Sequence, residues 1–280
     1  MKQYFRMYKK HPKAVALRIL VTTAAALTVL VLFSLVFYIL IKGIPNLKPS
    51  LFEWKYTSKN ASMIPAIINT ITMVLMTLLI AVPFGIGSAI YLTEYAKRGN
   101  KVVPVIRMTT ETLSGIPSIV YGLFGYMAFV RWLDWGYSLM AGIITLAIMI
   151  LPLIMRTTEE ALLAVPDSYR EGSYGLGAGR LRTIFRVVLP SAMPGILSGV
   201  ILGVGRIVGE TAALIYTAGS VTGVPDSLMS SGRTLAVHMY ALLSEGLYTD
   251  EAYATAVVLL VLVFIINRLS AYVANKIQNR

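Results

Sequence analysis

The stretch Glu171–Pro190 reads EGSYGLGAGRLRTIFRVVLP and is polar, basic and rich in glycine. It lies between two apolar stretches, Tyr137–Met155 and Met193–Thr217, each close to the roughly 20 residues that cross a bilayer as a helix. A polar segment between two spans belongs at a membrane surface, where water can satisfy its backbone and its charges. The stretch therefore predicts a multi-spanning membrane protein with one patterned, water-facing loop.

The composition of the whole chain agrees with a membrane protein. Of its 280 residues, 56% are hydrophobic and 14% are charged, whereas soluble domains carry about 25% charged residues. We expect an all-α membrane protein with six spans, at Leu20–Ile41, Met63–Leu92, Thr112–Val130, Tyr137–Met155, Met193–Thr217 and Ala252–Val273. Residues 1–62 would hold an N-terminal cytoplasmic segment, the first span and an external loop, and residues 63–275 the transmembrane domain.

The net charge of +12 is distributed unevenly among the loops. If the N-terminus is cytoplasmic, the inner segments hold 18 of the 25 basic residues. Lys and Arg accumulate in short cytoplasmic loops, so we expect both termini in the cytoplasm. The basicity then reflects membrane topology, and no nucleic-acid partner is expected.

The inner loop before the fifth span carries signals for two short helices. Thr157 or Thr158, followed by two acidic residues, resembles a helix start, and Pro166 would end that helix. Asp167–Tyr174 can form a second helix, ended by the glycines that follow. Such a protruding helix can insert into a groove on a soluble partner.

Residues for catalysis are scarce. The chain has no GxxxxGK[ST] phosphate-binding loop, so we do not expect it to hydrolyse ATP. The two histidines, His11 and His238, are isolated from other metal ligands. We therefore expect neither an enzyme nor a metal or cofactor site.

The fifth span contains two charged residues, Arg206 and Glu210. On an uninterrupted helix they share a face with Gly195, Gly199 and Gly203, whose small size permits close helix contact. Charged residues inside a membrane usually mark a translocation path. This reading predicts a partly cationic step for an anion; the alternative is an ion pair that only fixes helix packing.

A second polar group lies at the start of the third span. Ser114, Ser118 and Tyr121 surround a glycine and a proline. Their hydroxyls could donate to an oxyanion. The alternative is that the serines satisfy helix carbonyls beside the proline.

The loop Glu171–Pro190 resembles the EAA loop of binding-protein-dependent ABC importer permeases, without a gap in the spacing. The matching positions are Glu171, Gly172, Ser173, Gly177, Val187, Leu189 and Pro190, with both alanines and the isoleucine of the pattern replaced. Four longer segments are similar to phosphate importer permeases of the PstA type: Leu113–Tyr126, Val165–Pro190, Gly205–Gly219 and Arg233–Leu242.

The resemblance implies a type I (MetI-like) ABC importer permease in a bacterial or archaeal cytoplasmic membrane, with a cytoplasmic coupling helix. It implies inorganic phosphate as substrate and four kinds of partner: a PstC-like permease subunit, a PstB-like ATPase dimer, a PstS-like phosphate-binding protein and the lipid bilayer. The alternatives are an ABC permease for another oxyanion, such as phosphonate, sulfate or molybdate, or an ion-coupled secondary transporter, which would show inverted repeats.

Overall fold

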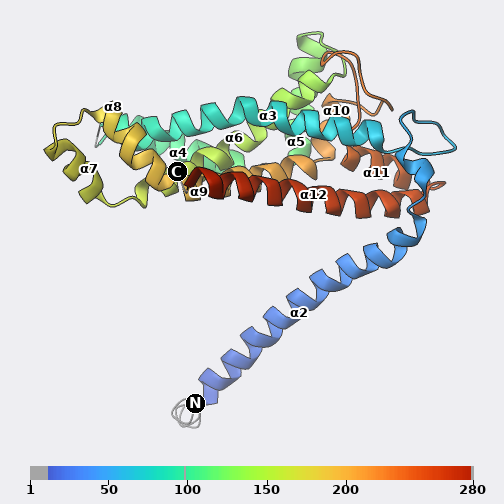
Figure 1. Cartoon of the computed structure of the whole chain (residues 1–280), viewed down its shortest axis with the longest axis horizontal. Helices are drawn as coiled ribbons and strands as arrows, with labels where there is room; N and C mark the ends of the chain where they lie inside the picture. Colours follow the sequence, from blue (N-terminus) through green and yellow to red (C-terminus); the bar gives the residue numbers. More distant parts are fainter. Residues whose placement is uncertain (1–11, 98, 279–280) are drawn as a thin grey trace.

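The computed structural model describes residues 12–97 and 99–278, and every regular element in those ranges is helical. Four long helices run side by side in Figure 1, with α2 leaving the body at an angle. The helices of the body are α3 (Ile64–Ile90), α6 (Leu139–Leu163), α9 (Leu189–Val208) and α12 (Thr249–Gln278), and the helix that leaves it is α2 (Pro12–Gly43). The expectation of an all-α membrane protein is confirmed.

The core forms where α3, α6 and α9 pack together. Glycines allow the close approach: a Cβ on Gly195 would lie 2.6 Å from the Cβ of Ala161, and one on Gly199 would lie 1.9 Å from Oγ1 of Thr157. Two glycines of the stripe expected on the fifth span therefore face α6. Small residues at four-residue spacing let helix backbones meet in this way.

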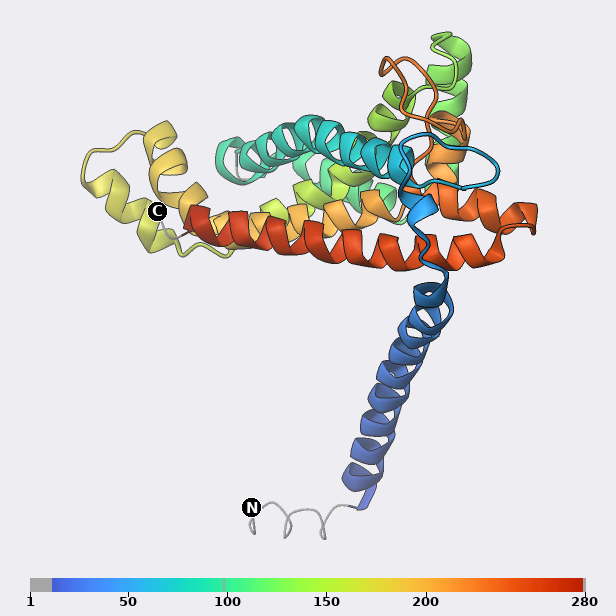
Figure 2. The same cartoon turned by 45° about the vertical axis from the view of Figure 1, so that its right-hand side comes forward.

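The first span, α2, is strongly apolar, with a mean hydropathy of 2.7, and none of its most apolar 18 residues is buried. It joins the body at its C-terminal end, where Gly43 lies against Tyr253 of α12 and the ring of Tyr38 packs edge-on against the same tyrosine at 5.9 Å between ring centres. Two short 3₁₀ helices, η1 (Ile44–Asn46) and η2 (Pro49–Phe52), then lead to α3. Figure 2 shows α2 standing away from the other spans.

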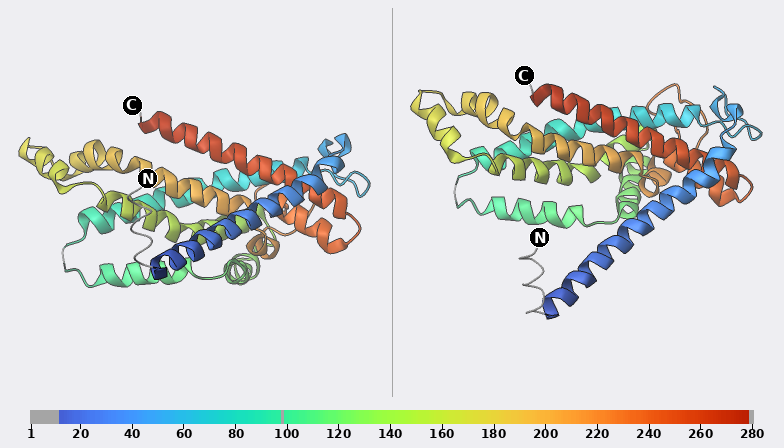
Figure 3. Two further views of the ribbon diagram at one scale, coloured as in Figure 1. Left: turned by 90° about the horizontal axis from the view of Figure 1, so that it is seen from below. Right: turned by 60° about the horizontal axis from the view of Figure 1, so that its bottom comes forward.

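The third span, expected at Thr112–Val130, begins earlier than expected and is broken into two helices. The chain forms α4 (Val102–Ser114), then α5 (Ser118–Gly125) with a π-helical extension η4 (Tyr126–Trp132), and the two parts are bent by 100°. Pro117 explains the break, because proline lacks an N–H and disfavours helical geometry in the residue before it. Figure 3 shows α4 along the bundle and α5 turning away from it. The described part of the chain has five candidate spans, or six if this pair counts as one.

The inner loop also differs from expectation, because no helix begins at Thr157 or Thr158. The helix α6 runs through both residues to Leu163, and Oγ1 of Thr157 donates to the carbonyl of Leu153 at 2.9 Å. The helix continues through its internal Pro152 and past both threonines, and it ends three residues before Pro166. The second expected helix is confirmed as α7 (Asp167–Gly175).

The fifth span begins earlier and ends earlier than expected. The elements α8 (Arg180–Thr183), η5 (Ile184–Val188, π-helical) and α9 form one span over Arg180–Val208. The helix stops at Gly209, and α10 (Ala212–Thr217) follows as a separate element. The remaining elements are η3 (Tyr91–Tyr95), a π-helical turn that ends α3, and α11 (Leu235–Glu245) in the loop before α12.

Candidate substrate pathway and coupling surface

Two helix breaks are joined by a close helix contact. The elbow between α4 and α5 lies at residues 115–117, and the break between α9 and α10 lies at residues 209–211. The helices that follow the breaks pack together: a Cβ on Gly122 of α5 would lie 2.7 Å from the Cα of Ala213 in α10. Broken helices are tolerated in membranes where backbone groups find protein partners or line a polar cavity.

The hydroxyls at the elbow bind the end of α4. Tyr121 is buried, and its hydroxyl donates to the carbonyl of Leu113 at 2.8 Å. Oγ of Ser114 donates to the carbonyl of Glu111 at 2.8 Å. Within the described ranges, Ser118 is half-buried and its hydroxyl forms no hydrogen bond. The alternative role, in which a serine satisfies a helix carbonyl, therefore describes Ser114.

Arg206 and Glu210 do not lie on one continuous helix, so the expected common face is wrong. Glu210 is 8% exposed, and its Oε1 accepts a hydrogen bond from the N–H of Ala213 at 3.1 Å. Its carboxylate thus caps the start of α10, where a negative charge is favourable. Among the described residues no ion pair joins Glu210 to Arg206.

Arg206 lies half-buried in the last turn of α9. The next residues of α9, Ile207 and Val208, lie in the same buried cluster as Tyr121 of α5, so the last turn of α9 packs into the core beside the elbow of the third span. It forms no ion pair within the ranges that the structure describes. Arg206 is therefore a cation without a carboxylate partner beside two helix breaks.

The inner loop presents an exposed surface at one end of the molecule, with α7 and α8 at the left of Figure 1. Glu171, Gly172 and Gly177 are exposed, and Ser173 is half-buried, with its hydroxyl 2.9 Å from that of Thr183. Leu176 is 91% exposed. Tyr169, Tyr174 and Leu181 of the same segment are also exposed, and a group of exposed apolar side chains is typical of an interaction surface.

Gly177 follows the end of α7 and stops that helix through its backbone conformation. Its φ is +80°, a left-handed geometry that glycine adopts without strain. Its N–H donates to the carbonyl of Tyr174 at 2.9 Å, which closes the helix end. Leu189 and Pro190 then form the first turn of α9, so the loop leads directly into the fifth span.

Ion pairs between α4 and α6 were not expected from the sequence. Arg107 of α4 pairs with Glu159 of α6 at 2.5 Å, and Arg156 of α6 pairs with Glu111 of α4 at 3.6 Å. Within α6, Arg156 also pairs with Glu160, one turn further on, at 3.0 Å. No residue of α4 is buried. The sequence does carry a signal for α4, because its apolar and polar residues alternate with the 3.6-residue period of an amphipathic helix. A span that starts at Thr112 cuts this pattern in two, so the helix was not predicted.

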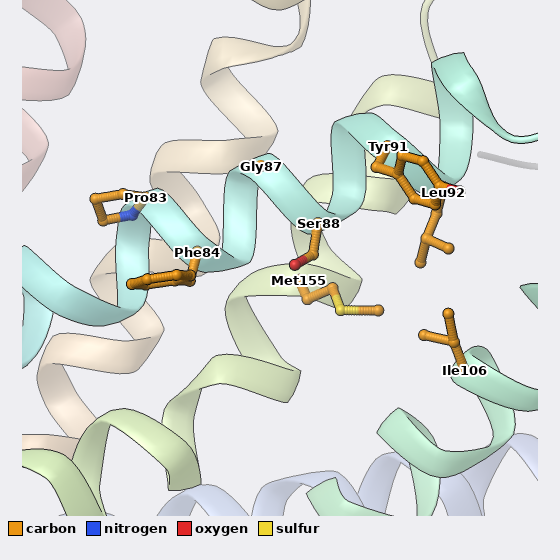
Figure 4. A pocket seen from close by; sticks show the side chains of 8 residues that line it. All are labelled: Pro83, Phe84, Gly87, Ser88, Tyr91, Leu92, Ile106 and Met155. Atoms are coloured by element: carbon orange, nitrogen blue, oxygen red, sulfur yellow. The ribbon is translucent and has the colours of Figure 1, made fainter.

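A cleft of about 400 Å³ separates α4 from α3. Figure 4 shows its lining, with Ser88 of α3 beside Met155 of α6 and Leu92 of η3 pointing toward Ile106 of α4. Most of this lining is apolar, so the cleft is not itself an anion site. Beside this cleft, α4 is held to the bundle by its ion pairs with α6 and by Val103 and Ile106, which pack against the buried cluster that contains Met155 and Leu162.

Comparisons with known proteins support the expectation from the loop motif. The chain is 34% identical over 279 residues to "Probable ABC transporter permease protein YqgI" of Bacillus subtilis, covering 91% of this chain and 93% of that protein. It is 43% identical over 154 residues to "Phosphate transport system permease protein PstA 2" of Mycobacterium bovis, covering 55% of this chain and about half (50%) of that protein. The expected PstA-like resemblance is confirmed.

A solved structure shares the fold. A bacterial ABC transporter involved in the import of the acidic polysaccharide alginate superposes with a TM-score of 0.67 at 14% identity, covering 97% of this chain and 99% of that chain. The expected type I ABC importer fold is thus confirmed. Residues 81–279 match the family model "Binding-protein-dependent transport system inner membrane component". The chain belongs to this family: it is the membrane permease component of an ABC importer, which has no ATPase site of its own.

Proposed function

We propose that this chain forms half of the pathway for inorganic phosphate in an ATP-driven importer, with Arg206 as its cationic step. The observation that carries the proposal is the unpaired, half-buried guanidinium beside two helix breaks. A phosphate ion would supply the missing counter-charge, because guanidinium groups bind phosphate oxygens through charge-assisted hydrogen bonds. The likeness to a phosphate permease of Mycobacterium bovis supports phosphate over other oxyanions.

The other polar residues of the elbow have supporting roles in this proposal. Glu210 holds the break after α9 by capping α10. Tyr121 and Ser114 hold the end of α4, and the hydroxyl of Ser118 is available to the anion. Alternating access would expose Arg206 first to the outside and then to the cytoplasm.

The proposed partners follow from the family and from the exposed loop. A PstC-like permease would complete the pathway, and a PstS-like protein would deliver phosphate from outside. A PstB-like ATPase dimer would bind the surface formed by Glu171, Gly172, Ser173, Gly177 and the start of α9 at Leu189 and Pro190. The basic inner segments support placing this loop and both termini in the cytoplasm.

Uptake of radiolabelled phosphate by the purified complex in proteoliposomes tests the proposal. Arg206→Gln should reduce ATP-dependent uptake by roughly 10- to 100-fold, the equivalent of losing one charge-assisted contact of about 1.5–3 kcal/mol. The matched control is Arg131→Gln, because Arg131 is an exposed arginine outside the elbow. Undiminished uptake by Arg206→Gln would remove this residue from the pathway. ATP-dependent uptake of labelled sulfate or molybdate, without uptake of labelled phosphate, would change the substrate.

A further inference from the structure

The inner end of α3 is held by two arginines from the coupling loop. Nη2 and Nε of Arg170 donate to Oε1 of Glu94 at 2.7 and 3.1 Å. The guanidinium carbon of Arg180 lies 4.9 Å from the centre of the Tyr95 ring, within the range of a cation–π contact. Neighbouring residues of η3 are thus bound from α7 and from α8.

Arg170 also binds the end of α6. Its Nη1 donates to the carbonyl of Val165 at 2.8 Å, and its Nη2 donates to the carbonyl of Leu162 at 2.9 Å. Leu162 lies in the last turn of α6 and Val165 lies two residues beyond the end of that helix, so one side chain of α7 binds both the end of α6 and the segment that follows it. A single guanidinium therefore connects three helices: α3 through Glu94, α6 through the carbonyls at and just beyond its end, and α7, which carries it.

The Arg170–Glu94 pair is well shielded from water, with side chains 15% and 5% exposed. No residue of α7 is buried, and its backbone packs chiefly against α8 and η5. The connection from α7 to α3 therefore depends mainly on this side chain. Since α3 and α6 pack along each other in the core, a displacement of α7 reaches both helices together.

We infer that Arg170 is a positioning residue that transmits the movement of the coupling helix to α3 and α6 through Glu94. The inference rests on the proposed function, in which an ATPase moves α7. It adds a non-covalent route to the covalent one, which runs from α8 through η5 into α9. The motif positions that begin at Glu171 contact the ATPase in this scheme, and the preceding residue passes the movement inward.

Glu94→Gln and Glu94→Asp test the route, because Gln removes the charge and Asp keeps it on a shorter side chain. Phosphate uptake per ATP hydrolysed is measured in proteoliposomes, alongside ATPase co-purification and the melting temperature. Glu94→Gln should retain the ATPase while uptake per ATP falls by about tenfold, within the fivefold to 150-fold range typical of coupled sites. Glu94→Asp should recover part of the loss. Glu94 and Arg170 line a cavity of about 510 Å³ between the end of α3 and α7. Lys97→Gln is the control, because Lys97 lines this cavity too but is exposed.

The outcomes separate the inference from the proposed function. Wild-type complexes that retain no ATPase or import no phosphate would refute the proposed function. Normal wild-type uptake with an unchanged ratio in Glu94→Gln would refute only the inference. A parallel fall in melting temperature, ATPase binding and uptake, with no change in uptake per ATP, would show a structural role and also refute it.

A covalent tether provides a second test if Glu94→Gln folds poorly. The chain contains no cysteine, so Lys97→Cys and Tyr174→Cys, on opposite elements of the cavity, can be joined by a bismaleimide. If α7 and the end of α3 move as one unit, the tethered complex should import phosphate at the rate of the untethered double variant. A tether that stops uptake would show that the two elements separate during transport, and it would overturn the inference.

Discussion

The contact between Gly122 and Ala213 can be tested by adding one methyl group. In Gly122→Ala the new Cβ would lie 2.7 Å from the Cα of Ala213 and 3.2 Å from its carbonyl oxygen. Carbon atoms attract best at about 3.5–4.0 Å, so α5 and α10 must separate by roughly 1 Å to reach that range. The obstacle is backbone, which cannot rotate away as the end of a side chain can.

The expected cost combines two opposing effects. Overpacking costs about 1–3 kcal/mol, whereas replacing glycine by alanine inside a helix recovers roughly 1 kcal/mol. We expect a net loss of about 0–2 kcal/mol for Gly122→Ala. Gly87→Ala is the matched control: it also lies inside a membrane helix, but a Cβ there meets nothing within 4 Å, so we expect a gain of up to about 1 kcal/mol.

The assay compares the melting temperatures of the two purified variants and their phosphate uptake at equal protein. Because the α5–α10 contact joins the two helix breaks, Gly122→Ala should lower both quantities relative to Gly87→Ala. Equal melting temperature and equal uptake in the two variants would refute the close approach of α5 to α10, and with it the arrangement proposed for the pathway.

Two further predictions concern the outer segment and the coupling loop. Burial, and secondly the charge of Arg233, lower the pKa of His238 in α11 to about 3, so the folded chain keeps this ring neutral while the unfolded chain protonates it below pH 6.5. The contribution of His238 to stability should therefore be constant above pH 6.5 and fall by about 1.4 kcal/mol per pH unit as the pH drops toward 3. His238→Phe should weaken the fall in melting temperature between pH 7.5 and 5.5. An unchanged slope would contradict the burial of a neutral ring. Gly177→Val strains a backbone with φ of +80°, at a cost of roughly 1–3 kcal/mol. Less ATPase should therefore co-purify with Gly177→Val than with the control Gly175→Val, because Gly175 does not have a positive φ. Equal recovery would show that the left-handed conformation of Gly177 does not matter for ATPase binding.

Local signals in the sequence predict much of the coupling surface. Pro166 stops α6, Asp167 starts α7, and Gly177 supplies the left-handed residue that ends the helix. Each of these effects acts within a few residues, so a pattern along the chain suffices to predict it. The same reasoning failed at Thr157, because a capping residue begins a helix only where the preceding chain is not already helical.

The Arg206–Glu210 pair shows the limit of helical periodicity. A shared face follows only if the helix continues, and Gly209 and Thr211 interrupt it. The carboxylate of Glu210 then binds the backbone of α10, three residues ahead. In the sequence, the sign of this break is Gly209, and many uninterrupted membrane helices also contain glycine.

The sequence by itself determined a chain of apolar spans and a polar loop with the spacing of an importer permease, because these properties depend on composition and on distances along the chain. The cytoplasmic side of the basic loops is a prediction from the same composition. Only the tertiary structure decided which polar groups meet. Arg170 and Glu94 are 76 positions apart, and nothing local relates them. Their contact depends on α3 and α6 packing side by side and ending together at the inner face, where one guanidinium can reach a carboxylate and two backbone carbonyls at once.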